Sequence, residues 1–158
     1  MEEKKIGVLI YVAAGTLFNM KLFNIFVTDK RLLFSHITKE ASKETERLLN
    51  EKVKGKSFKE RLSIIASHRY ELPERYETMS FEEIIQEHPI NFAMDLNEIV
   101  NVKIKRPKTT DSKGWQNPDY MIINTHTKKY RVNSISKDDL ITLNKVLGDK
   151  AKVPCIIL

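Results

Sequence analysis

The segment FNIFVTDKRLLF, residues 23–34, decides the fold of this 158-residue chain. Two apolar runs flank a short polar step from Thr28 to Arg31. Aspartate tolerates turn geometry and can bond its own backbone, so Asp29 suits the corner of a hairpin, and the two basic side chains keep that corner in water. We therefore predict a β-hairpin here, in preference to a charged site in which Lys30 and Arg31 hold a ligand.

The sequence around this corner also has the composition of strands. Residues 6–13 form a continuous apolar run, and residues 22–27 and 32–37 are rich in Phe, Ile, Val and Leu at successive positions. Strands that are apolar on both faces are expected where one face meets the core and the other is covered. The apolar start is too short to cross a bilayer and follows Glu2 and Glu3, so we predict a buried strand rather than a cleaved signal peptide.

Residues 39–90 differ in composition and are predicted to form a helical insertion. The first part is polar with a thin apolar stripe, and Ser57 and Ser80 each begin a capping box that starts a further helix. The second helix carries three large apolar residues on one face, namely Phe58, Leu62 and Ile65. Either the chain's own barrel or a second copy of the chain must cover this stripe, and packing on the own barrel is the ordinary outcome. If the insertion instead serves as an arm for self-association, the barrel should fold without residues 40–90.

Strand patterns return after the insertion. Residues 100–105 alternate apolar and polar side chains, which indicates a half-exposed strand. Residues 119–134 are predicted to form a hairpin. A last helix begins with a capping box at Ser136 and stops at Gly148.

The order of these elements resembles that of a pleckstrin-homology-like barrel. Residues 23–34 are similar to the paired strands of GRAM-like and bacterial PH-like domains. MDLNEIVNVKIKR, residues 94–106, resembles the next strand of that family, and KKYRVNSISKDDLITLNKVL, residues 128–147, resembles its last strand and C-terminal helix.

The resemblance implies a single, mostly β domain of the α+β type, and a binding module. The implied barrel has about seven strands, is built from residues 1–38 and 91–148, and is capped by a C-terminal helix. The helical insertion then covers residues 39–90, and an apolar C-terminal tail covers residues 149–158. The loop of the first hairpin offers Lys21 alone, whereas phosphoinositide-binding members of the family carry several spaced basic residues there.

Composition favours a binding protein over an enzyme. Lysine and arginine number 27 against 21 acidic residues, giving a net charge of +6 and a pI of about 9.3, which favours anionic partners. The single cysteine excludes an internal disulfide and suits a reducing compartment, so we expect a cytoplasmic protein, with a peripheral membrane location as the alternative. The four histidines show no metal-binding spacing, and His88 and His126 are predicted at the surface. We therefore predict no catalytic residue, no cofactor and no metal site.

Basic residues are densest at the end of the strand over residues 100–105 and in the loop behind it. Lys103 and Lys105 should share one face, because side chains two apart on a strand point the same way. The candidate site for an anion or a partner is Lys103, Lys105, Arg106, Lys108, Lys113 and Trp115. Tryptophan beside lysines suits a membrane interface. The same cluster could instead bind an acidic protein surface. A further alternative is that Trp115 folds back onto the barrel and the lysines only keep the protein in solution.

The chain ends in CIIL, which matches a prenylation motif at Cys155; alternatively, the apolar tail docks on the barrel or a partner. These patterns predict a non-catalytic PH-like binding module that acts on an anionic membrane surface or on a protein partner. The alternative is a structural or self-assembly protein that uses the insertion 39–90. Nucleic acid is a weaker candidate, because the basic residues are not interleaved with exposed aromatic residues on one strand face.

Overall fold

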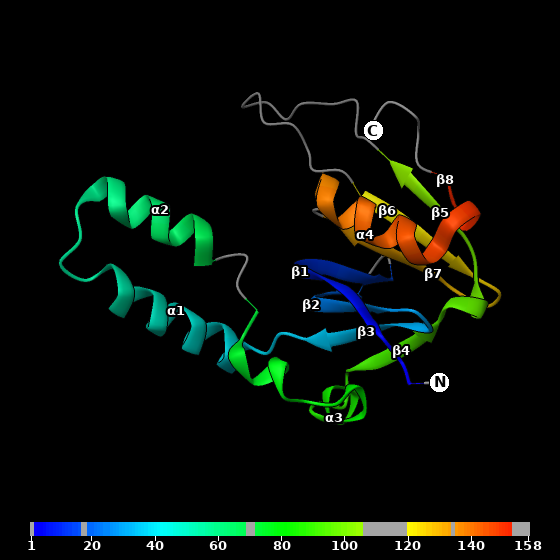
Figure 1. Cartoon of the computed structure of the whole chain (residues 1–158), viewed down its shortest axis with the longest axis horizontal. Coiled ribbons are helices and arrows are strands. Elements are labelled where there is room, and N and C mark those ends of the chain that lie inside the picture. Colours follow the sequence, from blue (N-terminus) through cyan, green and yellow to red (C-terminus); the bar gives the residue numbers. More distant parts are fainter. Residues whose placement is uncertain (1, 17–18, 69–71, 106–119, 134, 153–158) are drawn as a thin grey trace.

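The computed structural model describes residues 2–16, 19–68, 72–105, 120–133 and 135–152. Within them, eight strands form one sheet (Figure 1). The strands are β1 (Lys5–Thr16), β2 (Asn19–Thr28), β3 (Arg31–His36), β4 (Phe92–Asp95), β5 (Ile99–Lys105), β6 (Tyr120–Thr125), β7 (Lys129–Asn133) and β8 (Ala151–Lys152). Their order is β4-β3-β2-β1-β7-β6-β5-β8, and all neighbours are antiparallel except β5 and β8.

The pairing of β7 with β1 turns two meanders into one barrel-like sheet. Ala14 lies opposite Val132, so the last long strand returns to the first. Helix α4 (Lys137–Leu147) follows at once and begins with a capping box, in which Ser136 Oγ accepts from Asp139 N–H at 3.1 Å. The prediction of a mostly β, barrel-like α+β fold of seven antiparallel strands with a C-terminal helix is therefore confirmed.

The main core lies between the concave side of the sheet and α4. Leucines on one face of α4 pack there, as the sequence stripe predicts: Leu140, Leu143 and Leu147. Leu9, Ile25 and Ile123 come from three different strands and are all fully buried. Burial of this many aliphatic side chains supplies most of the favourable free energy of folding.

The corner of the opening segment is a structural turn. The hydroxyl of Thr28, which is fully buried, accepts hydrogen bonds from the N–H groups of Lys30 at 3.2 Å and Arg31 at 2.9 Å. The guanidinium of Arg31 binds Glu3 near the N-terminus and Glu82 in the insertion. The prediction of a hairpin corner is confirmed, and Arg31 holds three segments of the chain together.

The outer face of β2 and β3 is covered by the second half of the insertion. This half contains the 3-10 helix η1 (Glu74–Glu77) and the helix α3 (Phe81–Gln86). Phe26 and Leu33, which point away from the main core, form a second buried cluster with Tyr76 and Ile84. This cover explains why the two strands are apolar on both faces.

Polar contacts hold this cover in place. The hydroxyl of Tyr76 lies 2.8 Å from Ser35 Oγ and donates to Glu87 Oε2 at 2.9 Å. Burial, with the hydrogen bond to Glu87, raises the pKa of the Tyr76 hydroxyl. The buried side chain of Asn91 donates to the carbonyl of Ile84 at 2.7 Å and accepts from the N–H of His36 at 2.7 Å. The insertion over residues 39–90 is therefore not one detachable arm, because its second half belongs to the folded core.

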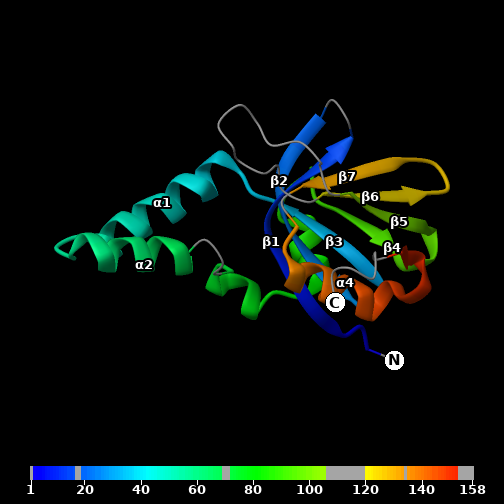
Figure 2. The ribbon, with the colours of Figure 1, turned by 90° about the horizontal axis from the view of Figure 1, so that it is seen from above.

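The first half of the insertion is a helical hairpin of α1 (Lys39–Val53) and α2 (Phe58–His68), which projects from the barrel (Figures 1 and 2). No residue of α1 is buried. At the base of the hairpin, the hydroxyl of Tyr11 lies 3.1 Å from Ser42 Oγ. Tyr11 sits in a bulge of β1 with φ +59°, where its N–H donates to the buried Asn24 Oδ1 at 3.1 Å.

Candidate functional site

The outward side of β5, β6 and β7 is the strongest candidate site in the described part of the chain. Buried residues alternate with outward ones along each strand: Val102 in β5, Met121 and Ile123 in β6, and Val132 in β7 point inward. The outward residues, which we call the basic face, are Asn101, Lys103, Lys105, Tyr120, Ile122, Asn124, Lys129, Arg131 and Asn133. Four of these nine side chains are cationic, and none is acidic.

Strand register brings the cations together from distant parts of the sequence. Ile122 lies opposite Lys103 on one side and opposite Arg131 on the other. Lys103 and Arg131 are therefore two strand spacings apart, about 10 Å. Asn124 is flanked in the same way by Asn101 and Lys129. Charges at such separations lie within about one Debye length at 0.1 M salt, so their potentials add at the surface.

Several of the outward side chains hold one another in position. The guanidinium of Arg131 stacks over the ring of Tyr120 at 3.9 Å from the ring centroid, and its Nε donates to Asn133 Oδ1 at 2.7 Å. Asn124 Nδ2 donates to Asn101 Oδ1 at 2.8 Å. Preordered side chains lose less conformational entropy when a ligand binds. The basic face is therefore a partly fixed surface, with exposed lysines on β5 and β7.

The structure confirms the predicted placement of two residues of the candidate site, and the strand register adds others beside them. Lys103 and Lys105 are both exposed and lie on the same side of β5, as predicted. The other predicted members lie outside the described residues, namely Arg106, Lys108, Lys113 and Trp115, and so does Cys155. Sequence reasoning missed Tyr120, Lys129 and Arg131. The alternation along β7 is visible in the sequence, but its alignment with β5 depends on two strand pairings that no local pattern reveals.

The predicted stripe on α2 is left uncovered. Phe58, Leu62 and Ile65 are 78%, 53% and 36% exposed. The expectation that the chain's own barrel covers them is therefore wrong. The reason is that α2 pairs with α1 in a hairpin that stands away from the barrel. The capping box that starts α2 is present, with Ser57 N–H donating to Glu60 Oε2 at 2.8 Å.

Two histidines meet between β3 and the end of the insertion. The rings of His36 and His88 have centroids 4.9 Å apart, and His88 is partly exposed at the surface. Burial, with His88 and Lys21 nearby, lowers the pKa of His36. Among the described residues, no three His, Cys, Asp or Glu side chains are grouped as a metal ion would require. His126 is exposed, as predicted.

No helix within the described ranges is both long and apolar enough to cross a membrane. Comparison of the chain with protein-family models, with curated proteins and with solved structures finds no match in any of the three.

Proposed function

We propose that this chain is a non-catalytic binding module whose basic face binds the acidic surface of a protein partner. The observation that carries the proposal is the register of β5, β6 and β7, which groups Lys103, Lys105, Lys129 and Arg131 without an intervening carboxylate. A carboxylate that contacts one such cation in water gains about 1 kcal/mol. Several contacts together support reversible binding of an extended acidic surface.

The side chains of the basic face favour a protein over the other anionic surfaces. Tyrosine and arginine are enriched in protein interfaces, and the three asparagines add hydrogen-bonding groups. A bilayer surface is favoured by apolar or aromatic side chains that reach headgroup depth, whereas Tyr120 is half-buried beneath Arg131. Single-stranded nucleic acid needs open aromatic rings as stacking platforms, and the guanidinium of Arg131 already occupies the ring of Tyr120.

The PH-like resemblance remains part of this proposal. The strand number and the closing helix α4 support the resemblance, whereas the insertion between β3 and β4 departs from the pattern of that family. A fold of this kind hosts many functions, so the resemblance supports a binding role only by analogy.

The test compares two charge reversals that change the net charge equally. Lys103→Glu with Lys129→Glu alters the basic face, and Lys39→Glu with Lys43→Glu alters exposed positions on α1. The probe is fluorescent polyglutamate at low and high salt, with single-stranded DNA and anionic vesicles as parallel probes. The face variant should weaken polyglutamate binding by more than about tenfold, and the α1 variant by less than about threefold.

Equal weakening by the two variants would show that binding depends only on the net charge of the chain, and would reject the basic face as the binding site. If the chain binds DNA or vesicles more tightly than polyglutamate, and the basic-face variant loses that tighter binding, the proposal of a protein partner is rejected. The basic face would then be a site for nucleic acid or for membranes.

A further inference from the structure

The free end of the helical hairpin combines an exposed apolar stripe with a high density of cations. Phe58 has the largest exposed fraction, 78%, of any large hydrophobic side chain in the described residues. Leu62 and Ile65 extend the same stripe along α2, because residues four and seven apart share a helix face. Lys59 and Arg61 fall on the two sides of the stripe, at about 100° and 60° from Phe58 around the helix. The apolar surface is therefore bordered by positive charge.

The charge continues around the turn between the two helices. Residues 52–61 contain five basic side chains, which are Lys52, Lys54, Lys56, Lys59 and Arg61, and one acidic side chain, Glu60. The carboxylate of Glu60 is occupied by the N-terminal cap of α2, where its hydrogen bonds with Ser57 hold its pKa below the usual range. The end of the hairpin thus presents an excess of positive charge.

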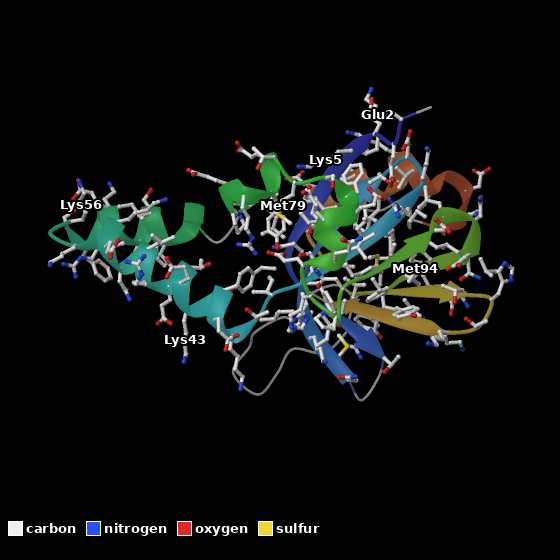
Figure 3. All side chains as sticks on the ribbon, turned by 90° about the horizontal axis from the view of Figure 1, so that it is seen from below. Glu2, Lys5, Lys43, Lys56, Met79 and Met94 are labelled. Atoms are coloured by element: carbon white, nitrogen blue, oxygen red, sulfur yellow. The ribbon has the colours of Figure 1, made fainter. Side chains whose placement is uncertain are left out.

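The position of this end allows it to touch a flat surface. The hairpin extends away from the barrel in two perpendicular views (Figures 1 and 2). Figure 3 places Lys56 at the far end, well separated from Met79 in the part of the insertion that packs on the barrel. An extended surface can therefore reach Phe58 without first meeting the barrel.

We propose that the hairpin end, residues 52–65, docks on an anionic lipid bilayer. Phe58 and Leu62 enter the boundary between headgroups and acyl chains, and the surrounding lysines meet anionic headgroups, as in interfacial amphipathic helices. A second copy of the chain is a poorer occupant. Face-to-face pairing of two α2 stripes would bring the Lys59 and Arg61 borders of both copies together, while the carboxylate of Glu60 is held by Ser57 in the N-terminal cap of α2.

This inference is independent of the basic face. The hairpin site would anchor the module at a membrane, whereas the basic face would hold a protein partner. Each can fail without the other, because the two sites share no residue.

The test measures co-sedimentation of the full chain with vesicles of phosphatidylcholine and phosphatidylserine, and with vesicles of phosphatidylcholine alone. Phe58→Ser should lower the partition onto anionic vesicles about tenfold or more. Lys54→Glu and Lys56→Glu, each made singly, should lower the partition onto anionic vesicles about fivefold or more. The matched controls are Ile141→Ser, at a 41% exposed apolar position on α4, and Lys103→Glu with Lys105→Glu on the basic face. Both controls should retain most of the binding.

A second measurement reports insertion directly. In a Trp115→Phe background, Phe58→Trp supplies the only tryptophan of the chain. Its fluorescence should shift to shorter wavelength with anionic vesicles and be quenched by brominated lipid. Unchanged binding of Phe58→Ser, equal loss in the basic-face control, or an unshifted emission spectrum of the Phe58→Trp variant would each overturn the proposal. It would also be overturned if light scattering showed a dimer that Phe58→Ser converts to monomer, since the stripe would then be a self-association surface.

Discussion

Substitution of Ile84 tests whether the second half of the insertion belongs to the core. Ile84 is 2% exposed and lies in the buried cluster with Phe26, Leu33 and Tyr76. Ile84→Ala removes three buried carbons, worth about 2.4 kcal/mol of transfer free energy at about 0.8 kcal/mol each. The cavity left behind adds to this value, so we expect a loss of about 3 kcal/mol in the free energy of unfolding.

The assay is urea unfolding followed by far-UV circular dichroism. With a slope of about 2 kcal/mol per molar urea, the midpoint of Ile84→Ala should fall by about 1.5 M at an unchanged slope. The control is Leu62→Ala, also in the insertion but 53% exposed on the projecting hairpin, which should change stability by less than about 0.5 kcal/mol. Similar shifts in both variants, or a loss below about 1 kcal/mol for Ile84→Ala, would refute the division of the insertion into a core half and a projecting half.

Three further changes test the packing of the barrel. A Cβ at Gly7 would lie 2.5 Å from Thr142 Cγ2 on α4, so Gly7→Ala should cost about 1–3 kcal/mol in urea unfolding, and adding Thr142→Ala should restore most of it. Thr28→Val removes the buried acceptor of two backbone N–H groups and should cost about 1–3 kcal/mol, whereas Thr28→Ser should cost much less. Burial raises the pKa of Glu3, but hydrogen bonds from Arg31 and Thr28 outweigh this and leave the pKa below its usual range. The stabilisation is therefore complete above the unfolded carboxyl pKa of about 4.3 and is lost as the pH falls below it, so Glu3→Gln should flatten the acid limb of a stability-versus-pH curve measured by thermal melting.

Local features of the fold are predictable from the sequence. The corner after β2, the capping boxes at Ser57, Ser80 and Ser136, and the leucine stripe of α4 each depend on residues within a few positions of one another. The turn after β6 is built in the same way as the corner at Thr28. There the hydroxyl of Thr125 accepts a hydrogen bond from the N–H of Lys128, three residues later, at 3.0 Å. Short-range hydrogen-bonding chemistry of this kind is visible in the order of residue types.

Features that depend on distant partners are not predictable in the same way. The stripe of Phe58 indicates an amphipathic helix, but hydrophobic periodicity does not reveal which surface, if any, covers it. The role of Tyr76 as a buried anchor also escapes detection, because ELPERY has the polar composition of a turn. The basic face is hidden for a related reason: Lys103 and Arg131 become neighbours only through the pairing of β6 with both β5 and β7.

The most direct test of the account is a titration of the ¹⁵N-labelled chain with polyglutamate, followed by amide chemical shifts. The account predicts saturable shifts on adjacent residues of the basic face, led by Lys103, Ile122 and Arg131, with smaller shifts at the cationic end of the hairpin of α1 and α2. The largest shifts on the hairpin, or weak shifts spread over all lysines of the chain, would contradict it.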